Sequence, residues 1–557
     1  MKEAGSLLSA PALASVDNSE PSLHGAAIAD NARGNGRRQT LTTIANARPA
    51  TGGAPGEEHV MSAASHDLVI RNARLIDGSG APAVSGDLAI EGERIAAVGR
   101  VPGAGRREID AGGKALAPGF IDTHTHDDGA LLRYPEMRFK LAQGVTTCVT
   151  GNCGFAVAPA AQAAGRIVAE SGILGLGGAA VTWDDLESYR QAVAARRPAV
   201  NAIALAGMGT LRYAALRNER RAPAAAELAQ MRGWVEQAME QGACGLSTGL
   251  IYEPNRWAET DEIAALCRAI APRGGVYATH MRNESDKLLD AVEETLTIGR
   301  DAGCGVHISH HKASARRVWG LVKDSLAKVD AARAAGQDVT LDVYPYPAGS
   351  TRLEALWRLG SFQDPEYAPL IRIATCPGHP EWQGKSVAEV ADALDLPYDQ
   401  AAERIVLGEG RETVVIQFTM SEDDVETNLR HPAVMVGSDG IPVLEGLPHP
   451  RLFGTFPRVL SRYVRERGVA PLEEMVRRMT SLPAARFGLA GRGLLREGAY
   501  ADLVLFDPET VRDTATYEAP MQEPEGIALV VVNGVVACEH GSHTGAGTGR
   551  LLRFREE

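Results

Sequence analysis

The fold of this chain is indicated by one stretch, which reads Gly119-Phe120-Ile121-Asp122-Thr123-His124-Thr125-His126-Asp127. The residues that lead into it, 115–121, are mostly apolar and predict a buried strand that ends near His126. Because alternate residues of a strand face the same side, we expect His124 and His126 to present their imidazoles on one face. Two neutral imidazoles on one face make half of a metal site.

The composition is typical of a globular enzyme with many loops. The 557 residues are 45% apolar and 23% charged, and they include 60 Gly and 30 Pro, so the chain can bury a large core. The net charge of −13, without a basic stripe, argues against nucleic acid as a partner. The seven cysteines are odd in number and scattered, which indicates a reducing compartment. No apolar run is long enough to span a membrane, so we expect a cytoplasmic protein that does not bind membranes.

The chain divides into segments with different patterns. Residues 1–62 have no sustained apolar period, so we expect a disordered N-terminal extension. Residues 63–118 and 486–557 contain short strands broken by turns, whereas 119–485 alternates short apolar runs with amphipathic helices. This alternation predicts an α/β fold, a TIM-like (β/α)8 barrel, and the two terminal segments are expected to form one small β-sandwich domain together.

Eight strands are expected in the barrel, ending near His126, Thr150, Leu205, Ser247, His280, His310, Tyr344 and Ser438. Helices are expected between them, for example at 223–241, where proline lies in the first turn, and at 286–301. Active sites of such barrels lie at the carboxyl ends of the strands. The interval of about 352–430 is too long for a simple connection, so we expect an insertion over the barrel mouth.

Candidate metal ligands follow five of these predicted strands, and they are His124, His126, Cys153, His280, His310 and Asp439. Histidines scattered over a surface would have no reason to gather at strand ends. A sulfur ligand beside nitrogen ligands suits Zn²⁺ and disfavours Mg²⁺ and Ca²⁺. Zinc lowers the pKa of a bound water to about 7 and polarises a carbonyl oxygen. We therefore predict a zinc-dependent hydrolase.

Several motifs resemble the D-aminoacylase (N-acyl-D-amino-acid deacylase) branch of the amidohydrolase superfamily, and the similarity spans about 67–555. The His-x-His motif marks only the superfamily. The turn Gly151-Asn152-Cys153-Gly154 is more specific to this branch, because most relatives bridge their metals with a modified lysine where this chain has Cys153. The other shared motifs are Ser309-His310-His311-Lys312, Gly437-Ser438-Asp439-Gly440, and the segments 245–252, 342–351 and 449–458.

The resemblance implies hydrolysis of a small-molecule substrate, an N-acyl-D-amino acid, to a D-amino acid and a carboxylate. It implies a tightly held zinc ion on Cys153, His280 and His310, and a second, weaker position framed by His124, His126 and Asp439. It also makes Asp439 the general base and acid. The residues that it places around the substrate are Tyr252, Tyr344, Ser350 and Arg451, with Arg451 suited to bidentate binding of the α-carboxylate. Lys312 is a further candidate for binding an oxyanion or a carboxylate.

Two residues set this chain apart from the pattern of the branch. Met208 stands where members often have a histidine, so activity or substrate preference is expected to differ. Arg352 follows Ser350-Thr351, where a substrate side chain could reach. We hypothesise that Arg352 permits acidic side chains, such as that of an N-acyl-D-glutamate.

Two other functions are alternatives to a deacylase. A cyclic amidase of the dihydroorotase or hydantoinase type would use the same barrel and zinc chemistry, and fold alone does not separate the two. Cys153 and the predicted substrate-binding residues from Tyr344 to Arg451 argue against a cyclic amidase. A catalytically inactive barrel kept as an assembly scaffold would be expected to lose metal ligands, and all six candidates are present here.

Overall fold

The structure is a computed structural model that describes residues 65–158, 181–408, 410 and 412–556. The extension expected to be disordered, 1–62, lies outside the described residues. Within the described ranges, no helix combines the length and the apolar character needed to cross a lipid bilayer.

Two parallel sheets contain the strands predicted for the barrel. One sheet has the order β6-β7-β8 and the other the order β9-β10-β11-β12-β13-β17. Their residues are almost all buried, as expected of parallel strands that are covered on both faces. The strands are β6 (Phe120–Asp122), β7 (Val145–Thr150), β8 (Asn201–Ala204), β9 (Ala206–Gly207), β10 (Gly245–Gly249), β11 (Val276–His280), β12 (Gly305–Ile308), β13 (Val339–Val343) and β17 (Val434–Val436).

The first of these strands is shorter than predicted. β6 ends at Asp122, so His124 and His126 lie in the loop that follows it, and strand alternation does not direct their rings. The Asp122 side chain accepts a hydrogen bond from the backbone N–H of Ser438 at 2.7 Å. Thr125 then forms an isolated parallel bridge with Gly440. These contacts with the segment after β17 hold the loop, and the loop places the two imidazoles.

Helices connect the parallel strands along the chain. The helices predicted at 223–241 and 286–301 are α6 (Ala225–Glu240) and α8 (Leu288–Ala302). Glu227 caps α6 by accepting a hydrogen bond from the backbone N–H of Ala224 at 2.7 Å. The remaining α-helices of the described residues outside the insertion are α1 (Ala130–Arg133), α2 (Arg138–Leu141), α4 (Leu186–Arg196), α5 (Met208–Leu216), α7 (Thr260–Ile270), α9 (Val322–Ala334), α13 (Glu422–Arg430), α14 (Arg451–Arg458), α15 (Leu472–Met479) and α16 (Ser481–Arg486), and a π-helix, η8 (Val459–Glu466), follows α14.

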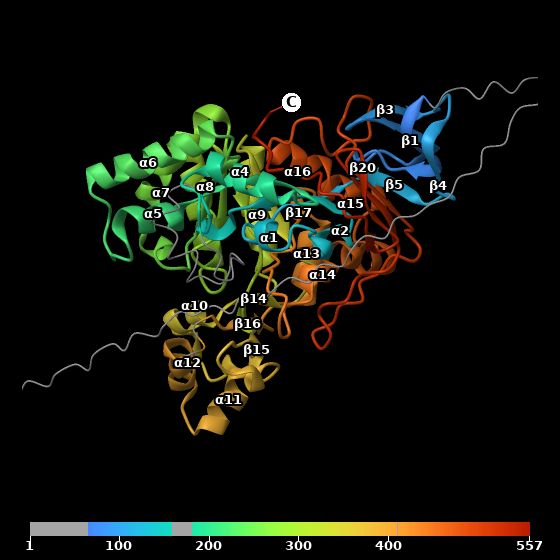
Figure 1. The fold of residues 1–557 in the computed structure, drawn as a ribbon. Helices are drawn as coiled ribbons and strands as arrows, with labels where there is room; N and C mark the ends of the chain where they lie inside the picture. Colours follow the sequence, from blue (N-terminus) through green and yellow to red (C-terminus); the bar gives the residue numbers. More distant parts are fainter. Residues whose placement is uncertain (1–64, 159–180, 409, 411, 557) are drawn as a thin grey trace, which may run out of the picture. The chain divides into compact units, whose positions relative to one another are not determined.

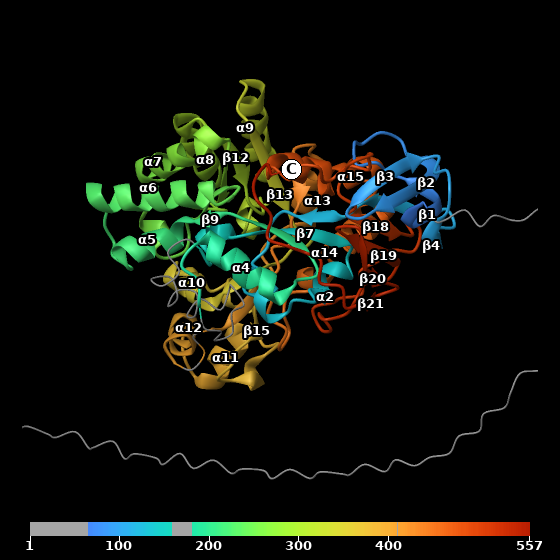
Figure 2. The same ribbon diagram turned by 45° about the horizontal axis from the view of Figure 1, so that its top comes forward.

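Strands from both ends of the described chain pair in one nine-stranded sheet (Figures 1 and 2). The junction is an antiparallel pair in which Ala115 lies opposite Phe506 and Pro118 opposite Leu503. Because β5 leads directly into β6, this sheet anchors the start of the first parallel strand. The strands are β1 (His66–Leu75), β2 (Val84–Glu91), β3 (Arg94–Gly99), β4 (Gly105–Asp110), β5 (Ala115–Pro118), β18 (Leu503–Phe506), β19 (Ile527–Val532), β20 (Val535–Glu539) and β21 (Ser542–His543).

A further antiparallel sheet interrupts the parallel pattern between β13 and β17. It has the order β14-β16-β15 and is accompanied by three helices (Figure 1). It has an apolar core of its own, which includes Leu353, Ile371, Val387, Ile405 and Val415. We call this segment, 349–417, the insertion. Its elements are β14 (Gly349–Arg352), α10 (Leu353–Arg358), β15 (Ile371–Thr375), α11 (Val387–Leu394), α12 (Tyr398–Leu407) and β16 (Val414–Gln417).

Candidate metal centre and active site

Cys153 lies at the centre of the candidate site and is placed by a tight turn after β7. Gly151 and Gly154 on either side both have φ of 75°, and a Cβ on Gly151 would lie 2.3 Å from the carbonyl oxygen of Leu205. Only glycine fits such a turn without strain. Asn152 donates hydrogen bonds from its side chain to the carbonyl oxygens of Val149 at 2.9 Å and Thr125 at 3.3 Å. The turn therefore aims a buried thiol toward the loop that carries the two histidines.

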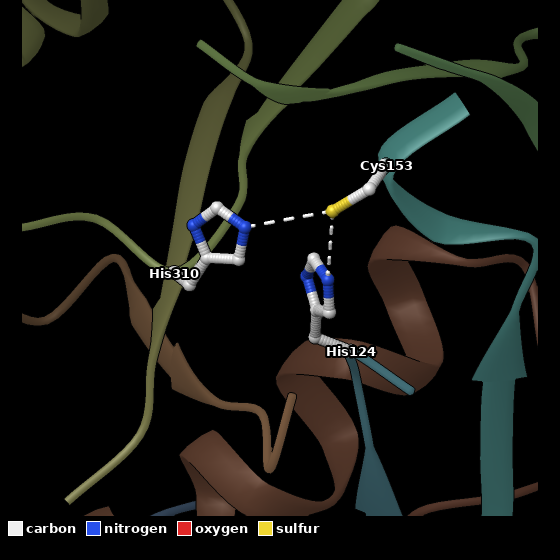
Figure 3. Close-up of side chains that lie close together, drawn as sticks. All are labelled: His124, Cys153 and His310. Carbon is white, nitrogen blue, oxygen red and sulfur yellow. Dashed lines mark hydrogen bonds between the residues drawn. The ribbon is translucent and has the colours of Figure 1, made fainter. Parts of the chain in front are cut away.

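Three imidazoles surround the sulfur. Cys153 Sγ lies 3.4 Å from His124 Nε2, 3.5 Å from His310 Nε2 and 3.9 Å from His280 Nδ1. Figure 3 shows the rings of His124 and His310 approaching the sulfur from two sides. Zinc bonds of about 2.3 Å to sulfur and about 2.05 Å to nitrogen, at a tetrahedral angle, place the two ligand atoms about 3.6 Å apart. The separations to His124 and His310 match this spacing, and the separation to His280 is somewhat longer.

A second cluster adjoins the first and shares His124. Asp439 Oδ1 lies 3.2 Å from His126 Nε2 and 3.5 Å from His124 Nε2. The ligand atoms of His124, His126 and Asp439 all lie within 4.8 Å of one another, as do those of His124, Cys153 and His310. The geometry thus offers two adjoining positions for a cation.

Three of the candidate ligands have unusual backbone conformations. Cys153, His310 and Asp439 have φ of 55°, 34° and 49°, in the left-handed region that non-glycine residues seldom adopt. Each such residue costs about 1 to 3 kcal/mol, which the surrounding structure must offset. Strain of this kind at three ligand positions, each just after a parallel strand, marks this edge of the sheets as a functional site.

The charges around the site hold two groups in their ionised forms. Burial alone would raise the pKa of the Cys153 thiol, but the surrounding imidazoles, His124 above all, lower it well below its usual value. Burial likewise opposes ionisation of Asp439, and the charges of Arg451, His310 and His124 nevertheless hold its pKa well below the usual range. A thiolate and a carboxylate are the forms in which these side chains bind a metal.

Two carboxylates that the sequence did not single out contact the histidines: Asp342 is fully buried, and the side chain of Glu284 is 10% exposed. Glu284 Oε1 lies 3.0 Å from His310 Nδ1. Asp342 Oδ2 lies 3.5 Å from His124 Nδ1 and 2.7 Å from His307 Nε2, and its Oδ1 accepts a hydrogen bond from the backbone N–H of His310. Glu284 follows His280 by four residues, and Asp342 lies two residues before Tyr344 in a predicted strand. These positions in the sequence are the only signals that could have pointed to Glu284 and Asp342 as partners of the histidines.

A cavity of about 390 Å³ opens onto the cluster. Eight predicted site residues line it: His126, Tyr252, His280, His310, Lys312, Tyr344, Ser350 and Asp439. His124 and Cys153 are buried behind this lining. The insertion contributes a second wall through residues such as Leu356, Leu359, Tyr367 and Gln417.

The predicted substrate-binding residues Tyr252, Tyr344 and Lys312 each contact a different kind of group. Tyr252 shares a hydrogen bond with Thr351, with the two hydroxyls 2.9 Å apart, and the Tyr344 hydroxyl donates to the sulfur of Met420 at 3.3 Å. Lys312 donates from Nζ to Glu284 Oε1 at 2.7 Å. Met208, in the position of the branch's histidine, is fully buried at the start of α5.

Neither predicted arginine belongs to the described lining of the cavity. Arg451 Nη1 pairs with Asp439 Oδ2 at 3.0 Å, and its Nη2 donates to the carbonyl oxygen of Ser350 at 3.1 Å. Arg352 Nη2 donates to Glu354 Oε2 at 2.8 Å. Arg451 therefore reaches the metal cluster through Asp439, whereas Arg352 is held by a neighbouring carboxylate of the insertion.

Comparison with known proteins agrees with these features. The sequence profile of the amidohydrolase family matches residues 107–346 and 326–538. A D-aminoacylase from Alcaligenes xylosoxydans xylosoxydans is 45% identical over 489 residues, which cover 87% of this chain and 97% of that relative. The chain belongs to the D-aminoacylase branch of the amidohydrolase family.

This amidohydrolase has further close relatives. An N-acyl-D-glutamate deacylase from the same organism is 44% identical over 490 residues, 87% of this chain and 96% of the relative. A crystal structure is known of N-acyl-D-glutamate deacylase from Bordetella bronchiseptica in complex with zinc and a phosphonate that mimics the tetrahedral intermediate. The sequence of that protein is 42% identical to this chain. The structure superposes with a TM-score of 0.81 over 88% of this chain and 99% of that one. The resemblance stated from the motifs is thereby confirmed.

Proposed function

We propose that this amidohydrolase is a zinc-dependent N-acyl-D-amino-acid deacylase, which hydrolyses a linear amide to a D-amino acid and a carboxylate. The observation that carries the proposal is the buried thiolate of Cys153 among three imidazole nitrogens, next to a cavity that His280, His310 and Asp439 line. The preference for linear D-substrates rests on the names of the close relatives, since no distance in the site reveals handedness.

The donor set fits zinc. Cys153, His280 and His310 would hold the tightly bound ion, and His124, His126 and Asp439 would frame a second, weaker position. A thiolate with imidazoles is a ligand set that zinc prefers, and Cys153 Sγ lies 3.5 Å from His310 Nε2 and 3.9 Å from His280 Nδ1. When bound, zinc supplies Lewis acidity toward the amide carbonyl and makes water a stronger acid near neutral pH.

The chain's own residues would move the proton. Asp439 is ionised and lies at the cavity surface, so its carboxylate can accept a proton from the water that attacks the amide carbon. As the carbon–nitrogen bond breaks, the same carboxyl returns that proton to the leaving nitrogen. Water is thereby divided between the two products, and Asp439 is regenerated as a carboxylate.

Cationic and hydroxyl groups would hold the substrate. Arg451 is our candidate for the α-carboxylate because of the resemblance. It is buried outside the described cavity lining, and its Nε has no hydrogen-bond partner among the described residues. Lys312 lines the cavity and would assist with the oxyanion or a carboxylate. Tyr252, Tyr344 and Ser350 would complete the pocket.

We further propose that the two parallel sheets form one closed (β/α)8 barrel. Support comes from the backbone N–H of Asp439, which donates to the carbonyl oxygen of His124 at 2.8 Å, and from the bridge between Thr125 and Gly440. We propose the domain boundaries predicted above, with a terminal β domain from 63–118 and 486–557, and a cytoplasmic location.

The decisive experiment is an assay of the purified full-length chain with its zinc content measured in parallel. We expect hydrolysis of N-acetyl-D-methionine, and not of N-acetyl-L-methionine or dihydrouracil. Cys153→Ser should lose both zinc and activity. The matched control Cys244→Ser should keep both, because that buried thiol only approaches the carbonyl oxygen of Ala204, at 3.4 Å. Opening of dihydrouracil, or a zinc-loaded protein that leaves every N-acyl amino acid intact, would contradict the proposal.

A further inference from the structure

Glu284 lies between the outer nitrogens of two candidate zinc ligands. It follows β11 in a loop, and its side chain is only 10% exposed. Its Oε1 lies 3.0 Å from His310 Nδ1, and its Oε2 lies 3.5 Å from His280 Nε2. One carboxylate thus faces two imidazoles, with one oxygen for each ring.

The other nitrogen of each ring faces the sulfur of Cys153. His310 Nε2 and His280 Nδ1 lie 3.5 and 3.9 Å from Cys153 Sγ. The two histidines therefore use different nitrogens toward the metal position. A neutral imidazole that binds a metal through one nitrogen carries its hydrogen on the other, and that N–H needs an acceptor when it is buried. Glu284 is placed to supply one, because its Oε1 lies 3.0 Å from His310 Nδ1 and its Oε2 faces His280 Nε2, which has no hydrogen-bond partner among the described residues.

Lys312 holds this carboxylate in place. Its Nζ lies 2.7 Å from Glu284 Oε1 and 2.8 Å from the carbonyl oxygen of His310, both of which are acceptors. It also lies 2.8 Å from His310 Nδ1. An ammonium group can only donate, so this contact pairs Lys312 with an unprotonated Nδ1. With zinc at Nε2 the hydrogen would move to Nδ1, and the Lys312 hydrogens would then be directed to Glu284 and the carbonyl alone.

The same lysine argues against a metal ion at Glu284 itself. The ligand atoms of His280, Glu284 and His310 lie within 4.8 Å of one another and resemble a cation site. The Lys312 ammonium already contacts two of the three residues, however, and a metal ion beside it would meet a like charge. A carboxylate with a fixed ammonium partner acts here as an acceptor for imidazole N–H groups.

We propose that Glu284 is a positioning residue that sets the tautomer and ring orientation of both His280 and His310, with Lys312 as its anchor. This inference rests on the proposed zinc site. Carboxylates that accept the outer N–H of a metal-binding histidine commonly contribute about 10- to 100-fold in metal affinity. Glu284 serves two histidines, so its loss should weaken zinc binding through both.

The test is zinc affinity of full-length Glu284→Gln, measured by competition with a chromogenic chelator. The amide has one acceptor oxygen and presents an NH₂ group to the other ring, so we expect zinc to bind about 10- to 100-fold more weakly. With Co²⁺ in place of zinc, the thiolate-to-cobalt absorption of Cys153 should persist at saturation, because the ligands themselves are unchanged. Glu284→Asp, which is too short to reach both rings, should also bind zinc more weakly and serves if the amide variant does not fold.

The matched control is Glu262→Gln. Glu262 is a buried carboxylate that accepts a hydrogen bond from Arg212 Nε at 3.0 Å, and its side chain is 4% exposed. It should lose thermal stability without losing zinc affinity, which separates metal positioning from a general loss of buried charge pairing.

Three results would overturn parts of this scheme in distinguishable ways. Unchanged zinc affinity in both Glu284 variants would overturn the positioning role alone. Loss of a whole zinc equivalent at saturation in Glu284→Gln would make Glu284 a ligand instead. A wild-type chain that binds zinc no better than Cys153→Ser would overturn the proposed function together with the inference.

Discussion

The two walls of the cavity are built in different ways. At the ends of the parallel strands, the wall consists of buried charged and metal-binding groups such as His310, Lys312 and Asp439, each of which contacts another charged group. The insertion contributes mainly neutral side chains, including Leu359 and Tyr367, above an apolar core of its own. The comparison indicates that the chemistry belongs to the first wall and the fit of the substrate to the second.

The largest expected effect is on the charged wall, at Asp439. Asp439→Asn removes the proton acceptor but keeps the shape, so we expect kcat to fall by about 10²- to 10⁴-fold. Zinc at Cys153, His280 and His310 should remain, because Asp439 is not part of that set. Steady-state kinetics with zinc analysis checks this. A kcat within a few-fold of the wild type would show that Asp439 is not the proton acceptor. It would also argue against assigning the chemistry to the wall at the strand ends.

A smaller effect is expected on the neutral wall, at Leu359. This residue is 40% exposed and lines the cavity, so Leu359→Ala should alter substrate fit without unfolding the insertion. The substitution removes three carbons. Each methylene taken from water contributes about 0.8 kcal/mol, or about four-fold, so we expect kcat/KM for bulky substrates to fall by about 4- to 60-fold, depending on how many of these carbons the substrate covers, with kcat little changed.

Leu407→Ala is the matched control, since Leu407 is 66% exposed on α12 and does not belong to the described cavity lining. A fall in kcat alone for Leu359→Ala would mean that the insertion takes part in the chemical step.

The smallest effect is expected at Arg352. If its guanidinium reaches acidic substrates, Arg352→Ala should lower kcat/KM for N-acetyl-D-glutamate relative to N-acetyl-D-methionine. We expect less than about five-fold, because Arg352 already pairs with Glu354 and does not belong to the described cavity lining. Arg358→Ala is the control, since Arg358 pairs with the same carboxylate. An unchanged ratio of the two substrates would show that the hypothesis for Arg352 is wrong.

Much of the candidate site could be predicted from residue order. Cys153, His280, His310 and Asp439 each end or follow a parallel strand, and parallel strands bring their carboxyl ends to one edge. That rule needs no side-chain detail, so it placed these residues in one neighbourhood. It also brought His124 and His126 there, but β6 ends at Asp122 and not near His126, so strand alternation does not direct their rings. Contacts of Asp122 and Thr125 with the segment after β17 hold that loop.

The sequence by itself determined the kind of ligands, their chain order and the branch to which the protein belongs. Only the tertiary structure decided that Glu284 faces two histidines, that Asp342 lies between His124 and His307, and that Arg451 pairs with Asp439. The reason is physical. Strand direction follows from local pattern and carries chain segments to a common edge, whereas the nitrogen that a ring presents depends on hydrogen-bond partners supplied by elements distant in the chain.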